Sequence, residues 1–159
     1  MPILRSRGIM LPIKKIICPT DFSEPSFVGI KTAVELAEAN SSELILVHVI
    51  APVPKISGIG MPPVGYFPVV FGEMEQQAKE FLEKMRASQI PKHLKCLTVV
   101  ICGQPALHIT ELAQKEKASI IIMATHGQSG WQRFISGSVT ERVVRMAGCP
   151  VLAVPAPSQ

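Results

Sequence analysis

The chain of 159 residues lacks the features that mark several classes of protein. Nowhere do 18 consecutive apolar residues occur, and the basic N-terminal segment has no apolar run long enough for a secretory signal. Lysine and arginine are dispersed and the net charge is only +4, which argues against a nucleic-acid binder. We therefore expect a cytoplasmic protein with no membrane partner and no nucleic-acid partner.

Several chemical motifs are missing as well. The four cysteines form no CxxC pair, so we expect buried, reduced thiols rather than a metal site or a disulfide. No GxxxxGK[ST] occurs, no GxGxxG follows the first apolar run, and "GQSG" lacks the spacing of a nucleophile elbow. A phosphate site in this chain would have to rely on backbone amides and hydroxyl groups.

The apolar residues alternate between short continuous runs and helical spacing. Five runs predict strands: 15–18, 44–49, 97–101, 120–124 and 151–154. Between them, apolar residues recur at the spacing of one helix face, as in Met74, Ala78, Phe81, Leu82 and Met85. This alternation predicts a doubly wound α/β fold with a parallel five-stranded sheet and helices on both faces, and leaves the strand order open.

The domain organisation is simple. We expect an N-terminal extension over residues 1–13 and a single domain over 14–155. Residues 51–72 contain five prolines and four glycines and interrupt both periodicities, which predicts a long loop. That loop could be a lid over a site or a connector.

Asp21 is the only aspartate in the chain, and it follows the first predicted strand. Its carboxylate could cap the next helix or close an Asx turn, a task for which Ser23 competes. Ligands of open α/β sheets bind beyond the carboxyl ends of strands, so Asp21 could instead accept a hydrogen bond from a hydroxyl-rich ligand such as a ribose.

A glycine-rich segment over residues 123–144 joins the fourth predicted strand to the last helix. Gly137 leaves the helix start open, so the amides of residues 138–140 could face a phosphate with help from the helix dipole and two hydroxyl donors. A capping box between Ser138 and Glu141 would use the same amides internally. His126 could donate to a phosphate or form a local backbone bond, whereas His48 is expected to be a satisfied core residue.

These residues resemble the universal stress protein family, specifically its ATP-binding branch. The motif of that branch is Gly, two residues, Gly, nine residues, then Gly followed by Ser or Thr, matched here by Gly127 and Gly137 with Ser138. Ala124 stands where the motif has its first glycine, and we expect its methyl group to weaken binding without abolishing it. The segments "PTDFSEPS", "LILVHV", "ATHG", "GSVTERVV" and "CPVLAV" extend the resemblance over nearly the whole chain.

The resemblance implies strand order 3-2-1-4-5 and a nucleotide site built from two groups of residues. The adenine and ribose would lie against Pro19, Thr20, Asp21, Leu44 and Met123. The ribose and phosphates would be surrounded by Ala124, His126, Gly127, Gly137, Ser138, Val139 and Thr140. A Mg²⁺ or Mn²⁺ ion would be held through the phosphates and water rather than by protein ligands.

The implied function is ATP binding in stress response or signalling, with at most slow hydrolysis. The resemblance also implies a homodimer formed through the C-terminal strand, residues 150–155, which is an apolar edge without a protecting charge. The alternative is a dimeric interaction or scaffold protein of the same fold that does not bind nucleotide, which the alanine at position 124 favours.

Overall fold

The computed structural model describes residues 12–52, 66–125 and 138–155, except for the side chains of residues 66–70 and 138. Its strands are β1 (Lys15–Pro19), β2 (Glu43–Ile50), β3 (Cys96–Cys102), β4 (Ile120–Ala124) and β5 (Val151–Val154). Its helices are α1 (Glu24–Asn40), α2 (Tyr66–Gln89), α3 (Pro105–Lys115) and α4 (Ser138–Met146). All five predicted strands are confirmed, each to within one residue at either end.

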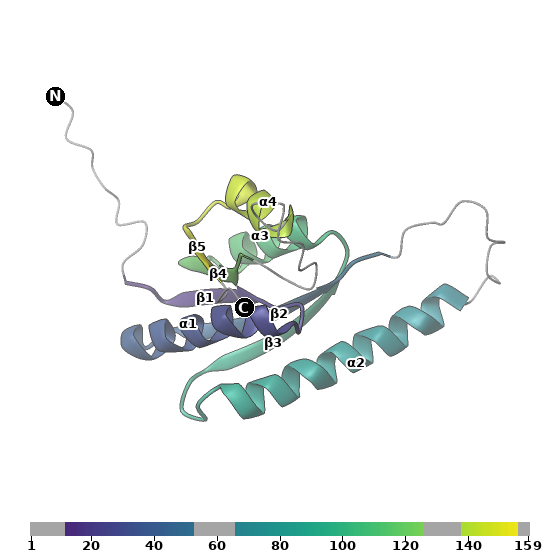
Figure 1. Cartoon of the computed structure of the whole chain (residues 1–159), viewed down its shortest axis with the longest axis horizontal. Helices are drawn as coiled ribbons and strands as arrows, with labels where there is room; N and C mark the ends of the chain where they lie inside the picture. Colours follow the sequence, from purple (N-terminus) through teal and green to yellow (C-terminus); the bar gives the residue numbers. More distant parts are fainter. Residues whose placement is uncertain (1–11, 53–65, 126–137, 156–159) are drawn as a thin grey trace.

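The five strands form one parallel sheet in the order β3-β2-β1-β4-β5, which confirms the order that the family resemblance implied. Helices α1 and α2 lie on one side of the sheet, and α3 and α4 lie on the other (Figure 1). None of the described helices has both the length and the apolar composition needed to cross a membrane.

Strand β2 shows how this sequence forms two cores. Successive side chains of a strand point to opposite faces. Leu44 and Leu46 accordingly join the cluster beneath α1 and α2, while Ile45 and Val47 join the cluster beneath α3 and α4. All four side chains are at most 1% exposed, which explains why the strand is a continuous apolar run rather than an alternating one.

Helix α2 begins earlier than predicted. The loop expected over residues 51–72 ends at or before residue 65, because Tyr66 is already helical. Pro68 is compatible with this start, since the amides of a helix's first turn have no partner within the helix. The expectation of a loop over residues 66–72 is therefore wrong, and residues 53–65 lie outside the described part of the chain.

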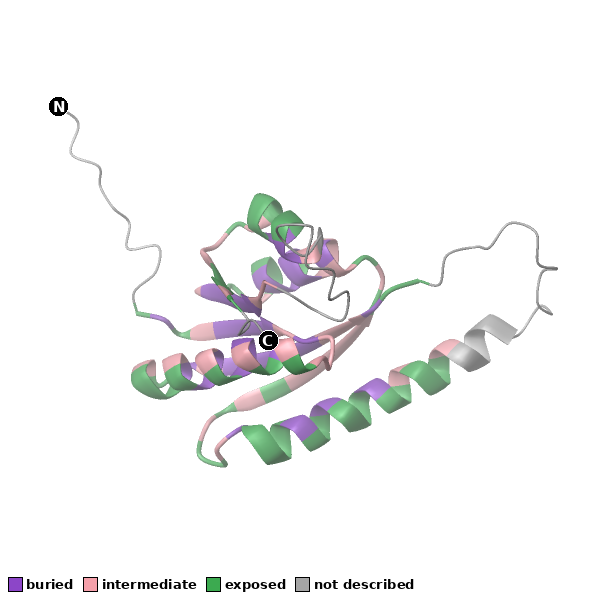
Figure 2. Cartoon of the chain, viewed as in Figure 1, coloured by how far each residue is buried: buried purple, intermediate pink, exposed green. Residues whose placement is uncertain are grey.

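The apolar stripe of α2 is only partly buried (Figure 2). Ala78, Leu82 and Met85 pack toward the sheet, but Met74 is 36% exposed and Phe81 is 54% exposed. The predicted apolar face of α2 therefore does turn toward the sheet. This face is broader than the area that the sheet covers, so its margins stay exposed to solvent.

All four cysteines are free, but only Cys18 is buried. Cys96 and Cys149 are half-buried and Cys102 is exposed, so the expectation of four buried thiols holds for one of them. Burial raises the pKa of the Cys18 thiol and raises that of Cys96 to about 11. Desolvation disfavours the thiolate, which makes both groups poor nucleophiles near neutral pH.

Candidate functional site

The candidate site lies at the carboxyl ends of β1 and β4, two neighbouring strands at the centre of the sheet. Ile16 pairs with Ile120 and Ile17 with Ile121, and both strands continue beyond these pairs, to Pro19 and to Ala124. Helix α1 leaves β1 on one face of the sheet, while α4 follows β4 on the other. This is a topological switch point, where open α/β sheets form ligand-binding crevices.

The turn after β1 is held by hydrogen bonds on both sides of Asp21. Thr20 is 6% exposed, and its amide donates to the carbonyl oxygen of Val47 at 2.9 Å. The Thr20 hydroxyl lies 2.9 Å from the Ser26 hydroxyl and accepts the amide of Phe22 at 3.1 Å. The turn is therefore anchored to β2 and to the first turn of α1.

Asp21 closes an Asx turn. Its Oδ1 accepts the backbone amide of Ser23 at 3.0 Å and also the Ser23 hydroxyl. Ser23 is the N-cap residue of α1 by position but makes no side-chain capping bond. An ionised carboxylate can accept about four hydrogen bonds, so this local role and a ligand contact are compatible.

The end of β4 meets both α1 and α4. A Cβ placed on Gly29 of α1 would lie 3.1 Å from the amide nitrogen of Ala124, which is tighter than most side-chain contacts, so glycine favours this close approach of the helix. From the other face, the Thr140 hydroxyl donates to the Ala124 carbonyl oxygen at 3.0 Å. The structure thus brings together Ala124, Thr140 and the first half of α1.

The Thr140 hydroxyl donates its hydrogen bond within the protein rather than pointing it at a ligand phosphate. Two hydroxyl donors for a phosphate were predicted at the start of α4, but Thr140 is 6% exposed and its proton goes to Ala124. At this position only the backbone amide is suited to an anion. It belongs to the first turn of a helix, where amides have no intrahelical partner.

The rest of the predicted α4 site is partly described. Val139 packs against the core on the α3 and α4 side of the sheet. Glu141, the proposed partner of Ser138 in a capping box, forms an ion pair with Arg145 at 2.6 Å. His126, Gly127 and Gly137 lie outside the described residues, as does the side chain of Ser138.

Leu44 is not brought together with the other predicted residues. It is completely buried at the amino end of β2, where it pairs with Ile16 and Cys96. Val49 is one candidate residue that the sequence analysis did not identify. It lies next to the last residue of β2 and packs against the same cluster as Met123, which is 6% exposed at the end of β4. The usable signal was its position at the carboxyl end of the strand.

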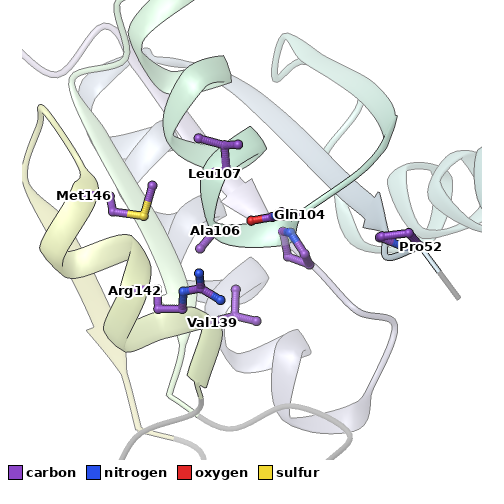
Figure 3. Close-up of a pocket in the computed structure, with 8 residues that line it drawn as sticks. Pro52, Gln104, Ala106, Leu107, Val139, Arg142 and Met146 are labelled. Carbon is purple, nitrogen blue, oxygen red and sulfur yellow. The ribbon is translucent and has the colours of Figure 1, made fainter. Parts of the chain in front are cut away.

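A hollow of about 190 Å³ opens beside Val139, between the N-terminal end of α3 and the length of α4 (Figure 3). It is lined by Pro52, Gln104, Pro105, Ala106, Leu107, Val139, Arg142 and Met146. Apart from the backbone, its polar groups are the Gln104 amide and the Arg142 guanidinium, for which no ion pair with another described residue is found. A small apolar wall with a nearby cation suits a planar or anionic ligand.

Sequence reasoning did not identify Gln104 and Arg142. Gln104 precedes the proline that starts α3, directly beyond the carboxyl end of β3. Arg142 lies three residues after Val139, on the adjacent helical turn. That these two residues line one hollow depends on the strand order and on which sides of α3 and α4 face each other. Composition and residue spacing do not give this information.

Within residues 12–52, 66–125 and 138–155, no three His, Cys, Asp or Glu side chains gather in a way that could hold a metal ion.

A family model described as the universal stress protein family matches residues 12–155. Universal stress protein MJ0531 of Methanocaldococcus jannaschii is 34% identical over 146 residues, covering 92% of this chain and 84% of that protein.

Solved structures show the same architecture. The structure of protein MJ0577, also from Methanocaldococcus jannaschii, has a TM-score of 0.81 and 28% identity, covering 92% of this chain and 99% of that one. A universal stress protein in complex with cAMP has a TM-score of 0.63 at 20% identity, covering 91% and 98% of the two chains. One from Archaeoglobus fulgidus in complex with dAMP has a TM-score of 0.56 at 17% identity, covering 91% and 99%.

Proposed function

Because the chain belongs to the universal stress protein family, we propose that it binds ATP or another adenine nucleotide at the carboxyl ends of β1 and β4, and acts in stress response or signalling. The observation that carries this proposal is that the Thr20–Asp21 turn and the Ala124–Thr140 contact follow two neighbouring parallel strands, β1 and β4, at the switch point of the sheet. Complexes with cAMP and dAMP in two proteins of this fold support the choice of an adenine nucleotide.

The described residues offer chemistry that fits each part of such a ligand. Asp21 supplies a carboxylate acceptor for a ribose hydroxyl, and the half-buried Val49, packed against the cluster that holds the buried Met123, supplies apolar surface for a base. The amides at the start of α4 and the guanidinium of Arg142 suit phosphates. Leu44 is left out of this proposed site, because its side chain is enclosed at the opposite end of β2.

We propose binding rather than rapid turnover as the function. Efficient phosphoryl transfer relies on a positioned base and on metal or cationic groups that neutralise charge in the transition state. A divalent ion accompanying the nucleotide would be held by the phosphates and by water.

Calorimetric titration with ATP tests the proposal. The wild-type chain should bind ATP, and Asp21→Asn, which keeps the side-chain shape, should bind it tenfold or more weakly, on the order expected for a hydrogen bond to a charged group. The matched control is Glu24→Gln, which removes another acidic side chain three residues away, in the first turn of α1. It should leave the affinity unchanged.

A comparison of ATP with 2′-deoxy-ATP tests whether Asp21 contacts the ribose hydroxyl. If Asp21 holds the ribose, Asp21→Asn should lower the affinity for ATP more than the affinity for its 2′-deoxy form. No binding of ATP, GTP or cAMP by the wild-type chain would reject the proposal and favour the scaffold function instead.

We also propose that two copies pair through β5. This strand pairs with β4 on one side, carries no charged residue, and exposes 39% of Leu152. An unprotected apolar edge strand invites pairing with another strand. Light scattering during size-exclusion chromatography should show a dimer that Leu152→Lys dissociates. Leu97→Lys, at the exposed position of the opposite edge strand β3, should leave the dimer intact.

A further inference from the structure

His48 and the turn that carries Asp21 are joined by a hydrogen bond of defined direction. The Nδ1 atom of His48 lies 2.8 Å from the carbonyl oxygen of Thr20. A carbonyl oxygen can only accept a hydrogen bond, so Nδ1 carries the proton and donates it. The ring therefore fixes the residue immediately before Asp21.

The same ring also fixes the residue immediately after Asp21. The rings of His48 and Phe22 are stacked with their centroids 4.3 Å apart and an interplanar angle of 30°. Phe22 adopts a φ of 64°, a left-handed conformation that is unfavourable for a bulky side chain. Such a conformation persists only where the surroundings determine it, and the His48 ring together with the Thr20 hydroxyl does so here.

A third ring connects this turn to α2. Phe81 contacts Phe22 with centroids 5.5 Å apart and an angle of 41°, while 54% of the Phe81 residue stays exposed. Lys84, on the same helix, places its Nζ 5.8 Å from the Phe81 ring centroid. The turn is thus held from β2 by His48 and from α2 by Phe81, with Phe22 between them.

We propose that His48 and Phe81 are positioning residues for ligand binding, which hold the Thr20–Phe22 turn, and with it Asp21, through the Phe22 ring. This inference rests on the proposed nucleotide function and deepens it. It assigns to α2 an influence on the ligand site. This helix packs on β2 and β3, which lie on the other side of β1 from β4.

The first test uses substitutions at two positions on one face of α2. Phe81→Ala should weaken ATP binding about two- to tenfold, the range that loss of an aromatic pair allows. Met74→Ala is the matched control, because Met74 is also partly exposed and lies seven residues, two helical turns, before Phe81. Met74→Ala should leave the affinity unchanged. Phe81→Tyr, which keeps an aromatic ring against Phe22, should bind ATP as well as the wild type does.

Two substitutions of His48 separate its contributions. His48→Phe keeps a ring against Phe22 and removes the donor to Thr20, whereas His48→Asn keeps a donor near the position of Nδ1 and removes the ring. Each should weaken ATP binding, since the proposal needs both contacts. Full affinity in either variant would overturn it.

Amide exchange with water, measured by NMR on the ligand-free chain, distinguishes this inference from the function on which it rests. The amides of Phe22 and Ser23 donate to Thr20 Oγ1 and Asp21 Oδ1, so they report on the turn without any nucleotide. Both should exchange faster in Phe81→Ala and His48→Phe than in the wild type or Met74→Ala. Unchanged exchange would overturn the positioning role even if ATP binds.

Faster exchange with unchanged ATP affinity would equally overturn the proposal, because the turn would then loosen without consequence for the ligand. If the wild-type chain binds no nucleotide, the proposed function fails. In that case the exchange rates still decide whether the aromatic contacts hold the turn.

Discussion

The two ends of the sheet treat their polar groups differently. At the amino end, charged side chains neutralise one another. The Nζ of Lys15 lies 2.7 Å from Glu116, and Glu43 lies 3.2 Å from Lys95. At the carboxyl end, the Arg142 guanidinium lines a hollow, and no ion pair links it to another described residue.

Backbone groups follow the same division. At the amino end, Ser119 accepts the amide of Lys14 through its hydroxyl and donates its own amide to the Lys15 carbonyl, and the Ser42 hydroxyl donates to Ile13. At the carboxyl end lie the starts of the helices that follow β1, β3 and β4, whose first amides have no intrahelical acceptor. One end is closed by its own groups. The other presents helix N-termini and the Arg142 guanidinium, which are the groups that the proposed nucleotide site uses.

The largest effect is expected where α1 approaches the carboxyl end. Gly29→Val forces side-chain atoms against the Ala124 backbone, and we expect it to lower the free energy of unfolding by about 1–3 kcal/mol. Gly72→Val is the control, because a Cβ there meets nothing within 4 Å. It should change stability by only a few tenths of a kcal/mol, the difference in helix propensity. Equal effects in urea unfolding would show that α1 and β4 are not closely packed.

A smaller loss is expected from Thr140→Val. The substitution keeps the side-chain shape but removes the hydroxyl that donates to Ala124, which should cost about 1 kcal/mol in a buried position. Thr32→Val removes a hydroxyl that donates to a carbonyl of its own helix, at a partly buried position, and should cost less. If the two variants unfold at the same urea concentration, the hydrogen bond from Thr140 to Ala124 contributes no more to stability than a hydroxyl bond within a helix.

The ion pairs at the amino end of the sheet should make the stability of the fold depend on pH. The hydrogen bond from Lys15 holds the pKa of Glu116 below its ordinary value of 4.5, so this carboxylate stabilises the fold above that value. The contribution is lost as the pH falls through the lower folded pKa. Glu116→Gln should therefore be slightly less stable than the wild type at pH 7, with the gap closing in acid.

Glu73→Gln is the control for that experiment, since no ion pair of Glu73 with another described residue is found. Its stability relative to the wild type should not change with pH in this way. A constant gap between Glu116→Gln and the wild type from pH 7 to pH 3 would contradict the role of the Lys15 bond. Exposed ion pairs are worth little, so we expect a small effect.

The smallest effect concerns reactivity rather than stability. Cys96 and Cys102 begin and end β3, but Cys96 is half-buried with a pKa raised to about 11, whereas Cys102 is exposed. Iodoacetamide at pH 8 should modify Cys102 first, as read by mass spectrometry of peptides, and leave the fold unchanged. Earlier modification of Cys96 would contradict the burial assigned to the amino end of β3.

The elements and their order were largely predictable, but for different reasons. Five buried parallel strands are readable because each is a continuous apolar run, as in Leu44–Val47 of β2. The strand order came from the family resemblance, since no local pattern encodes which strand lies next to β1. The start of α2 was missed because Pro68 and Gly72 suggest a loop, although proline is tolerated in the first turn of a helix and a single glycine further along only weakens it.

The site was predictable only in outline. The sequence placed Asp21 and the 123–144 segment at strand ends, and the strand order brings those ends side by side. Leu44 was placed in the site through the family resemblance, but it lies at the amino end of β2, opposite the end of the sheet at which Asp21 follows β1. That the Thr140 hydroxyl is used by Ala124 depends on a contact between residues 16 apart, which no spacing rule predicts.

The most direct measurement is an NMR titration of the isotope-labelled chain with ATP, followed through the backbone amides. We expect shifts concentrated at residues 20–23, at Ala124 and at Val139 and Thr140. The amides of Lys15, Glu43 and Ser119, at the other end of the sheet, should keep their positions. Shifts confined to the amino end, or none at saturating ATP, would contradict the claim that the carboxyl end of this sheet holds an adenine nucleotide.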